Sequence, residues 1–124
     1  MKFILTDRPR YWWPVTVRVP DESNAGKIMT QTLKVLFEPK PREEAIAAQE
    51  AYSKLLTERE RANHEKAQLL DIVKDWDDVI GADKSPVSFS AETFANALEQ
   101  RWFRDGVYLA YTQSLNGEEA QAGN

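Results

Sequence analysis

The chain has 124 residues, of which 42% are hydrophobic and 29% are charged, and its formal net charge is −4. This length predicts one domain with a single modest core and argues against a separate catalytic lobe. Acids and bases are interleaved, which argues against a nucleic-acid-binding face, and the absence of cysteine excludes disulfides and thiolate metal sites.

The first part of the chain, residues 1–38, predicts a β-hairpin or small sheet. VTVRV (Val15–Val19) alternates apolar and polar residues, which favours a half-buried strand, and IMTQTLKVLF (28–37) is typical of a second strand. The loop between them is short and rich in turn formers, so the two strands should pair antiparallel. The apolar run Phe3–Leu5 is a candidate third strand.

The second part, residues 41–116, predicts three to five helices. Pro41 followed by Glu43 and Glu44 is typical of a helix start, and the polar stretch 59–68 predicts helix with a break of undetermined position. We expect the next helix to end at Gly81, and its apolar stripe consists of Leu69, Ile72, Val73, Trp76 and Ile80.

A further helix start is predicted at Ser90, an N-cap residue flanked by the staple pair Phe89 and Phe94. Continuing that helical face places Trp102 in the core and turns Phe103 away from it. Gly106 interrupts the pattern, so the end of the chain is either one helix or two meeting near Asp105 and Gly106. Together these patterns predict a single α+β domain over residues 1–116 and a disordered tail over 117–124.

The polar residues that suggest chemistry match no catalytic, cofactor-binding or metal-binding pattern. Counted from Asp75, the acidic stretch has Val79 and Ile80 where a calcium loop needs an acid or amide and then a glycine, so its aspartates are predicted to be solvated. His64 is the only histidine and lies in the most polar part of the chain, as a surface residue would. The sequence therefore predicts a protein that is not an enzyme.

Aromatic residues are the candidates for binding another protein. Tyr11, Trp12 and Trp13 stand together before a proline, and alternation places Trp13 with the inward valines and Trp12 on the opposite face. Phe103 is the fourth candidate. Such rings serve either as cover for the sheet or as interface anchors, and both interpretations stay open at this point.

Several short motifs follow one another between Tyr11 and Asn124, namely WPV at Trp13–Val15, VPD at Val19–Asp21, WDDV at Trp76–Val79, Phe89-Ser90, and Ala110-Tyr111 with Leu115. In this order and spacing they resemble the tail assembly chaperones of long-tailed bacteriophages and prophages. The chain departs from that pattern near its end, where Glu118 and Glu119 stand in place of basic residues.

The resemblance implies a protein that binds the tape-measure protein, keeps it soluble in the host cytoplasm, and is absent from the mature virion. It also implies a longer form, made by −1 frameshifting, that recruits the major tail protein. Ala122–Asn124 can be encoded by a slippery run, which would place such a shift at the chain end. The alternatives are a structural tail-completion or connector protein, or a protein-binding adaptor.

The sequence predicts neither a membrane partner nor a signal peptide, since no apolar run approaches the length of a membrane span. A cytosolic protein is the default expectation. Self-association stays open, because an exposed edge of the hairpin could pair with another copy.

Overall fold

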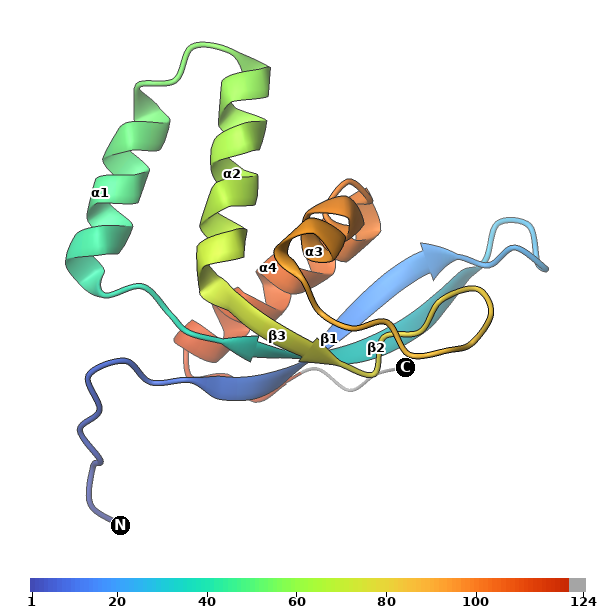
Figure 1. Cartoon of the computed structure of the whole chain (residues 1–124), viewed down its shortest axis with the longest axis horizontal. Coiled ribbons are helices and arrows are strands. Elements are labelled where there is room, and N and C mark those ends of the chain that lie inside the picture. Colours follow the sequence, from blue (N-terminus) through green and yellow to red (C-terminus); the bar gives the residue numbers. More distant parts are fainter. Residues whose placement is uncertain (121–124) are drawn as a thin grey trace.

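The computed structural model describes residues 1–120 and has a three-stranded antiparallel sheet of order β1-β2-β3 with four helices in that range (Figure 1). This confirms the predicted α+β class with an N-terminal hairpin. The elements are, in chain order, β1 Tyr11–Pro20, β2 Ile28–Phe37, α1 Arg42–Ser53, α2 Glu58–Ile72, β3 Val73–Asp77, α3 Ala91–Ala97 and α4 Arg101–Leu115.

The hairpin of β1 and β2 forms as the alternation predicted. Val15 stands opposite Leu33 and Trp13 opposite Val35, so the apolar residues of both strands share one face. Val15 and Val35 are fully buried there. Met29 lies on the same face near the hairpin turn and is 41% exposed, because the helices do not extend far enough to cover that end.

The third strand is not the predicted Phe3–Leu5, which lies outside the sheet with its side chains exposed, but β3. The prediction of one helix through Leu69–Ile80 is also wrong, because α2 ends at Ile72 and the chain is extended from Val73. Pairing with β2 sets Trp76 opposite Val35 and Asp77 opposite Lys34. A strand therefore lies inside the region 41–116 that was predicted to be helical.

The helices α1 and α2 form a hairpin that projects away from the sheet (Figure 1). The break between them lies at 54–57, before the stretch 59–68 where it was sought. Thr57 is the N-cap of α2: its hydroxyl accepts from the Glu60 N–H at 3.1 Å and donates to the Glu60 carboxylate at 2.9 Å. No residue of α1 is buried, so this helix contributes little to the core.

The start of α3 is as predicted. The Ser90 hydroxyl accepts from the Thr93 N–H at 3.0 Å, and the rings of Phe89 and Phe94 lie 5.8 Å apart. The helix that begins at Ser90 ends before α4 starts, so the interruption lies between α3 and α4. The helix α4 itself continues through Gly106 without interruption. After α4, Gly117 has a left-handed φ of 72° and Glu118 N–H donates to Gln113 O at 3.0 Å. Residues 121–124, the end of the predicted tail and the place of the predicted slippery codons, lie outside the described residues.

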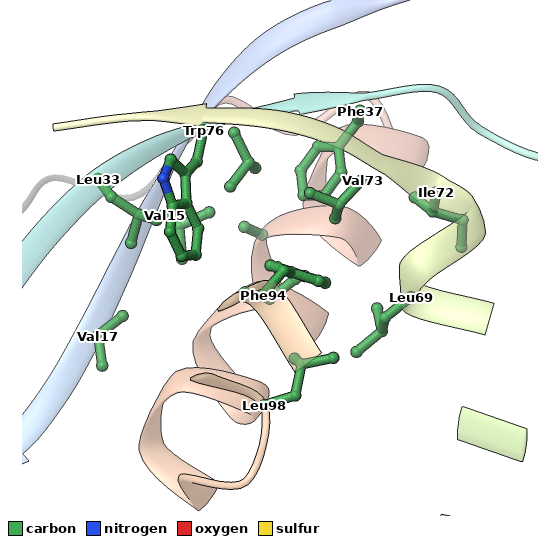
Figure 2. Close-up of a cluster of buried hydrophobic side chains, with 13 residues drawn as sticks. Val15, Val17, Leu33, Phe37, Leu69, Ile72, Val73, Trp76, Phe94 and Leu98 are labelled. Atoms are coloured by element: carbon green, nitrogen blue, oxygen red, sulfur yellow. The ribbon is translucent and has the colours of Figure 1, made fainter. Parts of the chain in front are cut away.

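One face of the sheet carries the core, and α3 and α4 cover it. Figure 2 shows Trp76 and Phe94 near the centre of this cluster, with Val15, Leu33 and Leu69 around them. We call the opposite face the bare face, because within residues 1–120 its side chains Trp12 and Ile28 are 47% and 52% exposed. The cluster consists of Val15, Val17, Leu33, Val35, Phe37, Leu69, Ile72, Val73, Trp76, Phe94, Leu98, Val107 and Ala110.

Candidate protein-binding groove

A groove of about 510 Å³ lies where the helices stop short of the hairpin end of the sheet. It is bounded by the far ends of β1 and β2, by the segment that follows β3, and by the start of α4. We call it the apolar groove, after the apolar side chains in its lining, which include Val17, Val19, Leu33, Val79, Ile80 and Phe103. Gln31, Thr32, Asp78 and Gln100 also line it.

One wall of the groove is a small hairpin, residues 79–87, that the sequence did not predict. Asp78, with a φ of 64°, turns the chain out of β3. Val87 N–H donates to Val79 O and Gly81 N–H donates to Ser85 O, both at 2.9 Å. Gly81 is therefore part of a turn and not the helix stop that was predicted. Its signal was present as the turn-forming run GADKSP between the apolar pair Val79-Ile80 and Val87.

Two side chains fasten this hairpin. The Asp83 carboxylate accepts from both the hydroxyl and the N–H of Ser85, at 2.7 and 3.0 Å, and these hydrogen bonds hold the pKa of Asp83 below its usual value. The indole N–H of Trp76 donates to Val87 O at 2.8 Å. The hairpin is thus tied to the buried core, which makes the wall of the groove a fixed surface.

Phe103 forms the inner end of the groove. Its ring packs edge-on against Trp76, at 6.4 Å, and against Phe94, at 5.8 Å, and is partly buried. Trp102, expected in the core, is instead 46% exposed. Because the helix is interrupted between α3 and α4, the 3.6-residue spacing that starts at Phe94 does not extend into α4. The residue of α4 that faces the core is therefore not the one which that spacing predicts.

The structure separates the four aromatic candidates. Tyr11 and Trp13 lie on the covered side: the Tyr11 hydroxyl shares a hydrogen bond of 2.6 Å with the Ser114 hydroxyl, and its ring stands 6.0 Å from that of Trp13. Trp12 lies on the bare face, where its Cα partner across the strands is Leu36. Only Phe103 lines the apolar groove, so these residues do not form one patch.

The rim of the apolar groove carries one acidic residue, Asp78, on the side of β3. Asp78 lines the groove, and its carboxylate oxygen lies 3.7 Å from the Lys34 ammonium nitrogen. Asp77, the preceding residue, has no ion pair among the described residues. Beyond them, the segment Asp78–Ile80 also borders a second groove of about 550 Å³ that contains Trp76 and Phe89. Asp78–Ile80 is therefore a ridge between two grooves.

A third hollow, of about 830 Å³, lies between α2 and the junction of α3 and α4, and its lining is mostly charged. Charged groups line it, and Lys66 and Glu99 pair across it at 2.6 Å. His64 lies beside this region with its ring 5.7 Å from that of Tyr52. Over residues 1–120, no group of three histidine, aspartate or glutamate side chains is arranged to hold a metal ion.

Comparison with protein families, with curated proteins and with solved structures finds no match to this chain. None of the helices within residues 1–120 combines the length and the apolar character needed to cross a membrane.

Proposed function

We propose that this protein is a phage or prophage tail assembly chaperone, which binds the tape-measure protein in the apolar groove and keeps it soluble during tail assembly. The observation that carries the proposal is the groove itself. It is open, and aliphatic side chains and one aromatic ring line it together with the polar residues Gln31, Thr32, Asp78 and Gln100. One of its walls is tied to the core. An amphipathic helix places its apolar face in a groove of this kind.

The motifs behind the family resemblance support the same location. Val19 and Val79 line the apolar groove, and Asp78 stands at its rim. Trp76 and Phe89 lie in the second groove beside it. Segments that are far apart in the sequence thus meet around one surface.

The size of the groove indicates weak and reversible binding. Burying three aliphatic side chains of a client would contribute roughly 5–9 kcal/mol. Association itself costs about 4 kcal/mol or more, which leaves at most about 5 kcal/mol, a dissociation constant of roughly 0.2 mM. A long client with many apolar stretches would engage several copies, and each copy could be released when the tail assembles.

Coexpression with the tape-measure protein tests the proposal. Ile80 is 61% exposed and lines the groove, whereas Ile46 is 41% exposed on α1, so glutamate at either position should leave folding intact. The wild type and Ile46→Glu should raise the soluble yield of the client, and Ile80→Glu should lose most of that effect. Equal yields with and without the chain would overturn the proposal.

A structural tail-completion or connector protein is the second candidate, favoured by the bare face of the sheet. Trp12 and Ile28 are about half exposed there, as residues buried between subunits of an assembly would be in an isolated chain. Purified tails decide between the two. A chaperone is missing from them, and a connector is present in fixed proportion.

The partnership with the major tail protein through a longer, frameshifted form belongs to the same proposal, as does action in the host cytoplasm. Reading the last codons of the gene tests the frameshift. A slippery run at Ala122–Asn124 supports it, and a run that cannot slip removes it.

A further inference from the structure

The helix α1 has little apolar packing to hold it in place. None of its residues is buried, and only Ala48 and Tyr52 are half-buried. Its N-cap residue, Pro41, makes no side-chain hydrogen bond, and its last turn has no basic side chain. An isolated helix of this length, 12 residues, is marginal in water. The stability of α1 therefore depends on the polar contacts that it makes with the rest of the chain.

The last turn of α1 is attached to α2 through Tyr52. The Tyr52 hydroxyl donates to the Glu65 carboxylate at 3.4 Å, and its ring stands 5.7 Å from that of His64. Both partners belong to α2, which the turn 54–57 joins to α1. The first turn of α1 lies a helix length away from these contacts, so its attachment must come from another part of the chain.

Glu38, close to the start of α1, is fixed in position. Its N–H donates to Ile72 O at the end of α2, at 2.8 Å, and its side chain is only 12% exposed. Three cationic side chains surround its carboxylate, with Arg10 at 2.7 Å, Arg8 at 3.8 Å and Lys74 at 4.0 Å. One carboxylate does not balance three positive charges, so this cluster attracts a further acid.

Arg8 links this cluster to α1. The two terminal nitrogens of its guanidinium face different carboxylates: one lies 3.8 Å from Glu38, and the other lies 2.8 Å from Glu44 in the first turn of α1. The bond from Arg10 to Glu38 fixes the chain two residues further along. Residues 7–10, which we call the strap, thus connect the end of the sheet with the start of α1.

We propose that the strap is a latch that controls how often α1 detaches from α2. While Arg8 holds Glu44, α1 is attached at both ends. When that ion pair opens, the contacts of Tyr52 and the pair of Lys40 with Asp71, 3.1 Å apart and just before α1, are what remain. Tyr52 also lines the hollow of about 830 Å³, so detachment of α1 removes part of the wall of that hollow. The strap thereby regulates how open the hollow is.

Amide hydrogen exchange resolved along the chain tests the latch. Arg8→Gln should quicken exchange in α1 by roughly two- to fivefold, the range expected for the loss of exposed ion pairs. Exchange in β2 should stay at the wild-type rate, which shows that the fold is intact. Arg101→Gln is the matched control, because it removes an exposed ion pair with Asp105 on α4 and should leave α1 unchanged. Equal α1 exchange in the wild type and in Arg8→Gln overturns the proposal.

The two glutamates at the start of α1 separate the ion pair from a general effect on the helix. Both lie in the first turn, where negative charge stabilises a helix. Glu44 is paired with the strap, whereas Glu43 has no ion pair among the described residues. Glu44→Gln should therefore quicken exchange more than Glu43→Gln does, and it should add little to Arg8→Gln. Equal effects of the two glutamates, or full additivity of Arg8→Gln and Glu44→Gln, would contradict the latch.

Salt tests the same contact without a further substitution. At about 1 M salt the attraction between exposed charges is screened beyond about 3 Å. The α1 exchange of the wild type should then approach that of Arg8→Gln, and a difference that persists undiminished would overturn the ionic latch. Neither α1 nor the strap lines the apolar groove, so a negative result here leaves the proposed function to its own test.

Discussion

Replacing Gly106 by alanine gives the most informative test of how α4 sits on the sheet. In a solvated helix this change stabilises by about 1 kcal/mol, because alanine has the higher helix propensity. Here the new Cβ would lie 2.6 Å from Thr16 O and 3.4 Å from Val17 Cγ2. The oxygen belongs to the backbone of β1 and cannot rotate away, so α4 must move as a unit.

Overpacking of this kind costs about 1–3 kcal/mol, and a clash with backbone belongs at the upper end. We therefore expect Gly106→Ala to lower the free energy of unfolding by about 2 kcal/mol. Urea denaturation followed by tryptophan fluorescence measures this. Thr112→Ala is the matched control, because Thr112 is exposed on the same helix and should be neutral or slightly stabilising. A Gly106→Ala protein as stable as the wild type would refute the close approach of α4 to β1.

Four further changes test other parts of the structure. Phe94→Ala removes a fully buried ring and should cost about 3–5 kcal/mol in urea denaturation; a loss below 1 kcal/mol would contradict its central place. Ser90→Ala removes the N-cap and should cost about 1 kcal/mol, whereas Ser90→Asp should retain most of that stability. Trp76→Phe loses the bond to Val87 O, so amide exchange should quicken in residues 79–87 first; uniform quickening would contradict a local fastening. The hydrogen bond from Arg10 holds the pKa of Glu38 below its usual 4.5, so stability should be full above that pH and fall as acid protonates the carboxylate; Glu38→Gln should flatten this dependence.

The parts of the fold that sequence could predict are those in which local signals agree. Strict alternation placed Val15 and Val17 on the buried face of β1, and the cap at Ser90 with the Phe89 and Phe94 pair located the start of α3. In each case, one short stretch contains both the propensity and the apolar pattern that the structure uses.

The predictions that proved wrong concern segments whose conformation is decided by tertiary contacts. The spacing of Leu69, Ile72 and Trp76 suits a helix, yet pairing with β2 extends the chain after Ile72 and still buries Trp76. The run Phe3–Leu5 has strand composition but lies outside the sheet with its side chains exposed. The apolar groove could not be predicted, since Phe103 joins it only because the break before α4 changes the helical phase.

Photocrosslinking from inside the groove tests the central claim most directly. A photoreactive amino acid at position 80 lies in the apolar groove, and one at position 12 lies on the bare face of the sheet. With the tape-measure protein coexpressed, we predict a crosslinked product from position 80 and none from position 12. A product from position 12 alone, or none from position 80 while the client stays soluble, would contradict the assignment of the groove as the binding site.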